Sequence, residues 1–527
     1  MHTKTRYHQK NNTQRCWCLH QQLAFVHTPW FVSPRIICIK FFHSVFFFLS
    51  VICFVSCSVT NQFTTEKKYS PQQLKEDVQA MEQTLKRNHP SLYWYSSKEQ
   101  IDSSFARAYK QVKDSMNENT FKNLIAETIF PIRCGHTSVR HSVQWNRYNT
   151  GRGPRGFPLN LKIADDSTLV ITNNFNRKDS VLKRGMLVTA INALSSKQII
   201  DTLLPMVAID GHAKNFSYQN ISNSFSAYYN SRFAGVSKYD ISYIDYSGNQ
   251  QQISLSALKP VRDTSARATP VLTQPQPEIS ARKRRMIAAR SFMIDSSRQF
   301  AVLRIGSFSR IVRRSYLRRS FQQLQQQQIP NLIIDVRNNG GGLIKSSLLL
   351  TRYIQQQRFT FTDSIFSATK QIRSSIPVKK KWIHNVGMFF LTRKQQEHQY
   401  RFVFFQKQVQ PKRQFYKGHV YVLTGGYSFS ATTMFLSNVK GNSNVTLVGE
   451  ETGGGYYGNN GVFIPEMVLP HTKLRVRLPL FRIVNDKAIV FNGSGVLPDV
   501  EVKANAETIK KNTDPKMEKV MELIKIN

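Results

Sequence analysis

One local pattern occurs twice in this sequence, in Asn331-Leu332-Ile333-Ile334-Asp335-Val336-Arg337-Asn338-Asn339-Gly340-Gly341-Gly342 and in Tyr421-Val422-Leu423-Thr424-Gly425-Gly426-Tyr427-Ser428-Phe429-Ser430-Ala431-Thr432-Thr433. Each stretch predicts a short buried strand, a glycine-rich turn and the start of a helix. This geometry presents backbone N–H groups and a hydroxyl at the edge of a sheet. Serine hydrolases are built in this way, so the pattern makes Ser430 a candidate nucleophile.

The second stretch predicts a helix over residues 428–440, because its apolar residues recur at helical spacing. Ser430 then falls in the first helical turn, where free N–H groups and the helix dipole favour an oxyanion. The N–H of Ala431 is a candidate oxyanion donor. The alternative is that Ser428 and Ser430 only cap the helix, which is the commoner role of serine at a helix start.

The three glycines of the first stretch allow a bare backbone to approach a reacting carbonyl group. Gly340 or Gly341 could therefore supply a second oxyanion donor. The alternatives are a simple turn, or a weak phosphate loop without the lysine and hydroxyl that a nucleotide site needs.

Four further motifs flank these stretches: Asn88-His89-Pro90-Ser91-Leu92-Tyr93, Cys134-Gly135-His136-Thr137, Val448-Gly449-Glu450-Glu451-Thr452-Gly453-Gly454 and Gly495-Val496-Leu497-Pro498-Asp499-Val500. In this order the series resembles that of the S41 peptidases, the C-terminal processing and tricorn-like proteases. The upstream motifs resemble the lipoprotein subgroup common in Bacteroidetes, and the resemblance covers most of residues 70–505. It implies a mixed α/β multi-domain chain with a ClpP/crotonase-like catalytic domain, serine endopeptidase activity on proteins or peptides, and no metal or organic cofactor.

The resemblance also assigns the base. The processing-protease branch has a lysine where this chain has Gly455, so a Ser-Lys pair is absent. His136 matches the histidine base of the tricorn-like branch, and a histidine can accept a serine proton at neutral pH. The alternative is a capping or core histidine. His89 is the rival base, but it precedes Pro90 and is expected to be structural.

The partner that orients the base is left open. Asn492 matches the position of the glutamate in tricorn-like proteases, and an amide can orient an imidazole without stabilising its charge. Glu450 and Glu451 are the alternatives, because both follow the predicted strand over residues 445–448. Either glutamate could equally be a solvated loop carboxylate.

The length of 527 residues indicates two to four domains. Amphipathic patterns, strand patterns and proline content divide the chain. We expect a leader over 1–57, a helical domain with the His136 loop over 58–150, a PDZ-like module over 151–258, a basic linker over 259–297, the catalytic domain over 298–505 and a last helix over 506–527.

The leader has the basic-then-apolar order of an export signal. It ends at Cys57 after a small residue, which resembles a bacterial lipoprotein signal with an acylated cysteine. We therefore expect a lipid-anchored protein of the cell envelope on the periplasmic side. The alternative is that Cys57 merely belongs to the apolar run. Only Cys134 lies beyond the leader, so no internal disulfide forms unless Cys57 stays unmodified.

Two rival functions are considered, and the first rests on charge. Lys and Arg number 73 against 32 Asp and Glu, which gives a net charge of +41 and suggests a nucleic-acid binder. However, Arg310, Arg314 and Arg318 recur opposite apolar residues, as on a solvated helix face, and no nucleic-acid motif accompanies them. We expect no nucleic-acid partner.

A catalytically silent peptide-binding protein of the same fold is the other alternative, motivated by Gly455 and Asn492.

Overall fold

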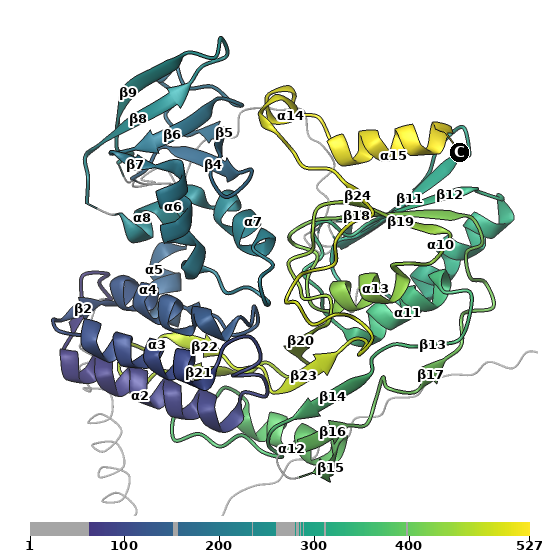
Figure 1. Ribbon diagram of the computed structural model, residues 1–527, viewed down its shortest axis with the longest axis horizontal. Coiled ribbons are helices and arrows are strands. Elements are labelled where there is room, and N and C mark those ends of the chain that lie inside the picture. Colours follow the sequence, from purple (N-terminus) through teal and green to yellow (C-terminus); the bar gives the residue numbers. More distant parts are fainter. Residues whose placement is uncertain are drawn as a thin grey trace, which may run out of the picture. The chain divides into compact units, whose positions relative to one another are not determined.

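The computed structural model describes residues 63–526 apart from 151–155, 234, 260–279, 281–283, 285, 288, 310–311 and 397–398 (Figure 1). The leader with Cys57 and most of the predicted linker lie outside the described residues. The part from Phe63 onward forms one compact unit. The predicted mixed α/β class is confirmed.

The amino-terminal section is helical, as its apolar periodicity predicts. Serine caps start two of its helices, since Ser70 and Ser97 each form a capping box with a glutamine three residues later. Helix α2 buries Leu74, Val78 and Met81 on one face. The elements are β1 (Lys68–Tyr69), α2 (Pro71–Asn88), α3 (Lys98–Gln111), β2 (Met116–Asn117), α4 (Glu118–Ile129), the short 3-10 helix η1 (Phe130–Ile132), β3 (Val139–Arg140) and α5 (Val143–Asn149).

Residues 156–258 form a strand-rich module with its own apolar core. Its sheet has the order β4-β5-β6-β8-β9, all antiparallel, with β7 paired to β6. The elements are β4 (Leu159–Ile163), β5 (Leu169–Asn174), β6 (Leu187–Ile191), β7 (Leu194–Ser195), α6 (Ser196–Leu203), the 3-10 helix η2 (Leu204–Met206), α7 (Asn215–Asn223), α8 (Phe225–Arg232), β8 (Lys238–Ile244) and β9 (Gln250–Ser256).

The catalytic section is built on a six-stranded sheet of order β10-β11-β12-β18-β19-β24. Its strands are parallel except for β10, an antiparallel edge strand that lies within the predicted linker. The bounds are β10 (Arg290–Ile294), β11 (Phe300–Ile305), β12 (Asn331–Asp335), β18 (His419–Thr424), β19 (Val445–Gly449) and β24 (Val500–Glu501).

Helices cover both faces of this sheet (Figure 1). Leu332 and Ile334 belong to the core with α10 (Arg314–Gln326), α11 (Ile344–Ile354) and α13 (Ala431–Val439). Ile333 points to the other face and packs with Val520 of α15 (Pro515–Ile526). This alternation with both faces buried explains the continuous apolar strands. The last helix expected over 506–527 is divided into α15 and the short helix α14 (Ala506–Lys511) before it. On α10, Arg314 and Arg318 are exposed, as predicted for a solvated face.

A second sheet of order β15-β16-β14-β23-β20 and a small sheet β21-β22-β3 complete the catalytic section. Their side chains share one core with α2, α3 and α4, so the amino-terminal helices pack directly on this section. The elements are β13 (Phe359–Thr360), β14 (Ser364–Ser367), α12 (Lys381–Leu391), β15 (Thr392–Gln396), β16 (Gln399–Phe402), β17 (Gln408–Val409), β20 (Gly458–Gly461), β21 (Glu466–Val468), β22 (Arg475–Arg477), β23 (Phe481–Val484) and α14 (Ala506–Lys511).

Candidate active site

Ser430 occupies a strained turn between β18 and α13. It is the N-cap of α13 rather than a residue of its first turn, with φ 57° and ψ −121°, a conformation that a residue with a side chain rarely adopts. Two glycines make room for this turn. A Cβ at Gly341 would lie 2.8 Å from Ser430 Cβ, and one at Gly454 would lie 3.0 Å from Ser430 N. Such a turn exposes a serine hydroxyl at the end of a strand.

Ser428, the other serine of this stretch, is fully buried. Its hydroxyl donates to the carbonyl oxygen of Val336 at 2.9 Å and accepts a hydrogen bond from the N–H of Gly425 at 3.3 Å. Ser428 therefore ties the two glycine-rich stretches together and has no free hydroxyl for chemistry.

His136 reaches Ser430 from the amino-terminal section. Its Nε2 lies 3.1 Å from Ser430 Oγ, and its ring packs on Phe429 with centroids 4.9 Å apart. The imidazole is 4% exposed. Burial, with a smaller contribution from the positive charge of Arg477, lowers the pKa of His136 to about 3. The ring is neutral at pH 7, the state in which it can accept a proton.

His89 does not face the serine. Its Nε2 lies 2.9 Å from Thr137 Oγ1, and its Nδ1 accepts a hydrogen bond from the N–H of Ser91 at 3.2 Å. Through Thr137 it supports the loop that carries His136. The structural role expected for His89 agrees with these contacts.

None of the three candidates for an orienting partner is bonded to His136. Asn492 Oδ1 accepts from the N–H and the hydroxyl of Ser494, at 3.0 and 2.7 Å. Glu451 Oε1 accepts from the N–H of Gly495 at 2.7 Å, and burial raises the pKa of this carboxyl. Within the described residues, His136 Nδ1 is buried and has no hydrogen-bond partner.

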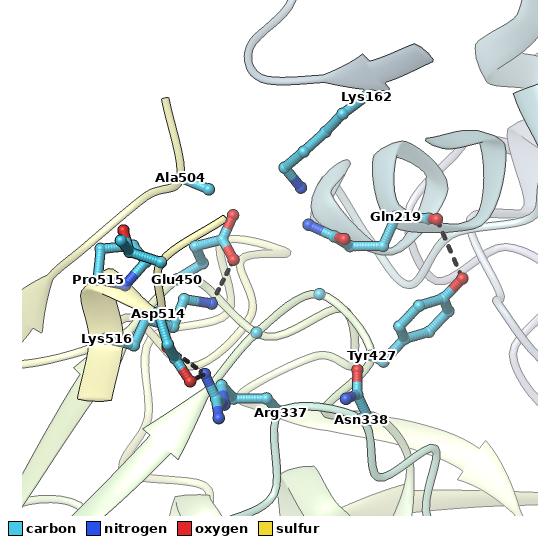
Figure 2. A pocket seen from close by; sticks show the side chains of 13 residues that line it. Lys162, Gln219, Arg337, Asn338, Tyr427, Glu450, Ala504, Asp514, Pro515 and Lys516 are labelled. Carbon is cyan, nitrogen blue, oxygen red and sulfur yellow. Dashed lines mark hydrogen bonds and ion pairs between the residues drawn. The ribbon is translucent and has the colours of Figure 1, made fainter. Parts of the chain in front are cut away.

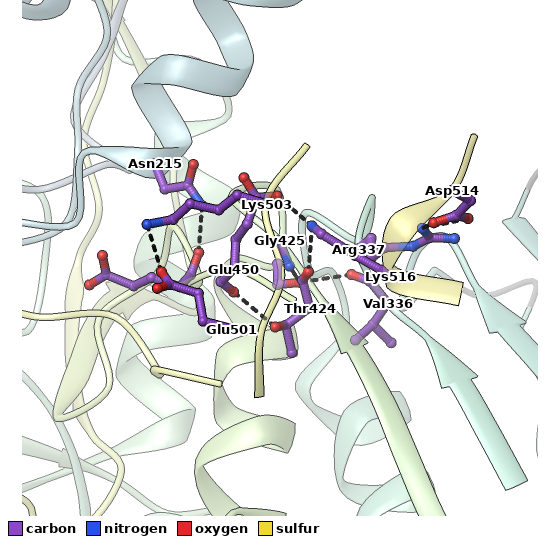
Figure 3. Close-up of polar contacts among 12 residues, drawn as sticks. Asn215, Val336, Arg337, Thr424, Gly425, Glu450, Glu501, Lys503, Asp514 and Lys516 are labelled. Atoms are coloured by element: carbon purple, nitrogen blue, oxygen red, sulfur yellow. Dashed lines mark hydrogen bonds and ion pairs between the residues drawn. The ribbon is translucent and has the colours of Figure 1, made fainter. Parts of the chain in front are cut away.

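Glu450 forms an ion pair with a residue of the last helix, α15, and does not contact His136. Its carboxylate pairs with the ammonium group of Lys516, which also donates to the carbonyl oxygen of Thr424 at 2.9 Å (Figure 3). Figure 2 shows this pair in a pocket of about 370 Å³ into which Lys162 and Gln219 also project. Glu450 therefore anchors α15 to the sheet.

Asp210 is a buried carboxyl beside the His136 loop that the sequence analysis did not find. Its Oδ1 accepts from the N–H of Gly135 at 2.7 Å, and the N–H of Gly455 also favours the charged carboxylate. Burial raises the pKa of Asp210 to about 7, while these N–H groups oppose the shift. Its Oδ2 is buried without a partner among the described residues. No spacing relates Asp210 to the other motifs; the only sequence signal is a carboxylate before a glycine.

The candidate oxyanion donors differ in availability. The N–H of Gly341 donates to Asn339 Oδ1 at 2.9 Å, so it is already used. In the part of the chain that the structure describes, the N–H groups of Gly340 and Ala431 make no hydrogen bond. A Cβ at Gly340 would meet open space, which places this residue at the open side of the turn.

Gly455 leaves no room for a lysine. A Cβ there would lie 2.5 Å from the carbonyl oxygen of Gly458. The described residues contain no cluster of His, Cys, Asp and Glu suited to a metal ion, and among them no helix is long and apolar enough to span a membrane.

Comparisons with known proteins identify the family of the catalytic section and the fold. The model for peptidase family S41 matches residues 299–502. Among solved structures, mature CPAF superposes with a TM-score of 0.58 at 13% identity, over 86% of this chain and 97% of that one. The complex of mature CPAF with lactacystin superposes with a TM-score of 0.57 at 13% identity, over 86% of this chain and 98% of that one. These likenesses show the fold. The photosystem II D1 C-terminal processing protease superposes with a TM-score of 0.38 at 12% identity, over 86% of this chain and 97% of that one. A search of curated protein sequences gave no match.

Residues 299–502 therefore match peptidase family S41, a family of serine-type peptidases. The resemblance stated from its motifs is confirmed, while its place in a lipoprotein subgroup stays a prediction.

Proposed function

We propose that the chain is an exported serine endopeptidase in which Ser430 is the nucleophile and His136 the base. The observation that carries this proposal is the 3.1 Å contact between His136 Nε2 and the hydroxyl of a serine held in a strained turn. His89, the rival histidine, is hydrogen-bonded to Thr137 instead.

In this mechanism Ser430 Oγ attacks the scissile carbonyl carbon while His136 Nε2 takes the hydroxyl proton. The N–H groups of Ala431 and Gly340 stabilise the oxyanion. The C–N bond then breaks, the amine leaves with the proton from His136, and a water molecule activated by the same histidine hydrolyses the acyl-enzyme. No step needs a metal or an organic cofactor.

Asp210 acts as a positioning residue in this proposal. It accepts from the N–H of Gly135, next to His136, and interacts electrostatically with the N–H of Gly455, in the turn beside Ser430. It therefore fixes the two loops whose separation sets the distance between base and nucleophile. Asn492, Glu450 and Glu451 keep their contacts elsewhere.

The experiment that tests the proposal is hydrolysis of an unstructured protein such as casein by the parent and two serine variants. Ser430→Ala should reduce the rate by several orders of magnitude, since loss of a triad nucleophile costs about a million-fold. Ser428→Ala should retain activity in whatever fraction folds. Equal activity of Ser430→Ala and the parent would contradict the proposal.

The second candidate function is a catalytically silent peptide-binding protein. It is favoured by the missing lysine at Gly455 and by the lack of a hydrogen-bond partner for His136 Nδ1 among the described residues. Binding of casein without cleavage by the parent would support this candidate.

Export and anchoring are a further part of the proposal. We expect acylation of Cys57, which would place the peptidase at the cell envelope on the periplasmic side. Expression in a lipoprotein-competent bacterium should give a membrane-bound form that begins at Cys57, and Cys57→Ser should abolish lipid labelling. A soluble product with an intact leader would contradict the anchor.

Nucleic acid is not a partner in this proposal. The test is a binding titration with duplex and single-stranded DNA over a series of salt concentrations. We expect no affinity at sub-micromolar protein, and a steep salt-dependent affinity would overturn this expectation.

A further inference from the structure

Helix α12 carries an apolar stripe on its outer face. Trp382, Ile383, Val386, Phe389 and Phe390 follow helical spacing, yet they are 71%, 45%, 49%, 57% and 65% exposed. A surface helix normally turns such a stripe toward the core. We call these five residues the α12 face.

The opposite side of α12 is fixed to the protein. Met388 is fully buried in the core shared with the amino-terminal helices. A Cβ at Gly387 would lie 2.9 Å from Phe463 Cζ, and Asn385 Oδ1 accepts from the N–H of Ile372 at 2.8 Å. The α12 face therefore points outward because the other side of the helix is already packed.

The neighbouring strand extends the apolar surface. The N–H of Val403 donates to the carbonyl oxygen of Leu391 at 3.1 Å, which places the end of β16 against the end of α12. Val403 is 39% exposed and Phe404 is 52% exposed. Figure 1 shows α12 beside β16 and the edge strand β15. Contiguous apolar surface of this kind marks an interaction site.

The charge of the chain segment that carries this surface is mainly positive, although Lys379 pairs with Glu466 at 2.7 Å. Lys370 places its ammonium group 4.4 Å from the ring centroid of Phe389. Residues 364–417 contain a single acid, Glu397, against Lys370, Arg373, Lys379, Lys380, Lys381, Arg393, Lys394, Arg401, Lys407, Lys412, Arg413 and Lys417. An apolar aromatic face with a basic surround is complementary to an anionic membrane surface.

We propose that the α12 face inserts into the interface of an anionic bilayer and that the surrounding lysines and arginines contact lipid headgroups. A helix of 11 residues is about 16 Å long and lies in the interface rather than crossing the bilayer. A second copy of the chain is the less suitable occupant. A two-fold contact through this surface would bring the same basic residues of both copies together.

The test is quenching of tryptophan fluorescence by brominated acyl chains in vesicles of phosphatidylglycerol and phosphatidylcholine. The full chain is used. The difference in quenching between the parent and Trp382→Phe reports on α12 alone, and it does so whether or not the leader also binds the membrane. We expect that difference to be large with anionic vesicles, and smaller with phosphatidylcholine alone or at high salt.

The double variant Phe389→Glu/Phe390→Glu should reduce the Trp382-dependent quenching at least about tenfold, because it removes two apolar anchors and adds two negative charges. Its control is Val181→Glu/Ile526→Glu, which makes the same charge change at residues 42% and 78% exposed outside this surface. Both variants should hydrolyse a soluble substrate like the parent, which shows that they fold.

Two results would overturn the proposal. One is a Trp382 signal that brominated lipid does not quench in vesicle-bound protein. The other is equal quenching in Phe389→Glu/Phe390→Glu and in its control. If sedimentation shows that Phe389→Glu/Phe390→Glu separates a dimer while Trp382 is unquenched by lipid, the α12 face joins two copies and the membrane proposal is wrong.

Discussion

His136 can serve as a base only while its imidazole is neutral, and its burial keeps it so. The ordinary pKa of histidine, near 6.5, would place the rise of activity between about pH 6 and 7. Burial against Phe429 and the charge of Arg477 both disfavour the imidazolium. The contact with Ser430 could be foreseen only from the family resemblance, because 294 residues separate the two.

The pH profile of kcat/KM should show this shift. A lowered pKa extends the neutral, active form to lower pH, so the acidic limb should have its midpoint below about 6 rather than between 6 and 7. His136→Ala should approach the defect of Ser430→Ala, and the double variant should be scarcely worse, since residues that act as a unit are non-additive. A midpoint at 6.5 or higher would contradict the burial of the base.

Asp210 predicts a pH dependence of stability. Its folded pKa of about 7 lies above the value of about 3.9 in an unfolded chain. The folded state therefore holds the extra proton, and the contribution of Asp210 is fully present below about pH 4 and lost as the pH rises to about 7. The slope is at most about 1.4 kcal/mol per pH unit.

Asp210→Asn should remove that slope, because an amide does not titrate in this range. Urea unfolding at pH 5 and pH 7 measures it, with Asp201→Asn on the exposed side of α6 as the control. If the parent and Asp210→Asn lose stability equally over this range, Asp210 does not titrate as proposed.

The turns that follow β12 and β18 are the elements that create the site. Glycine-rich sequence and apolar strands were enough to predict both turns and helix α13. The strained backbone of Ser430 was not predictable, because it results from the close approach of Gly341 and Gly454 in three dimensions. The contact of Glu450 was likewise set by a neighbour distant in sequence, Lys516. Asn492 instead bonds Ser494, two residues away.

Two adjacent glycines of the first turn should differ in tolerance. Gly341 has φ +96°, and an added Cβ would meet Ser430 Cβ and the N–H of Ala431, so Gly341→Ala should reduce kcat at least about a hundredfold. Gly340→Ala keeps its N–H and places its Cβ in open space, so it is the matched control with activity near the parent value. Similar losses in both variants would show that the turn does not contribute as described.

At the scale of the whole molecule, the base and the nucleophile are brought together by one shared core. The amino-terminal helices pack on β21, β22 and β23 of the catalytic section. Asp77 of α2 reinforces this packing, since its carboxylate accepts from the N–H groups of His471 and Thr472 at 2.8 and 2.9 Å. Amphipathic periodicity predicted the helices but not the surface that they cover, because periodicity carries no information on the packing partner.

Asp77→Ala should lower the free energy of unfolding by about 2–4 kcal/mol, because it leaves the part-buried N–H of His471 and the buried N–H of Thr472 without an acceptor. Asp201→Ala, which removes an exposed pair with Lys197, should cost less than about 0.5 kcal/mol. Urea denaturation of both variants measures the difference. Equal stabilities would argue against a tightly joined amino-terminal section.

The central claim, that Ser430 is a nucleophile activated by His136, is tested most directly by labelling with a fluorophosphonate and locating the adduct by mass spectrometry. The proposed mechanism predicts one adduct on Ser430 in the parent, none on Ser430 in Ser430→Ala, and labelling of His136→Ala slower by a factor of about a hundred or more. An adduct on another residue, or labelling of His136→Ala at the parent rate, would contradict it.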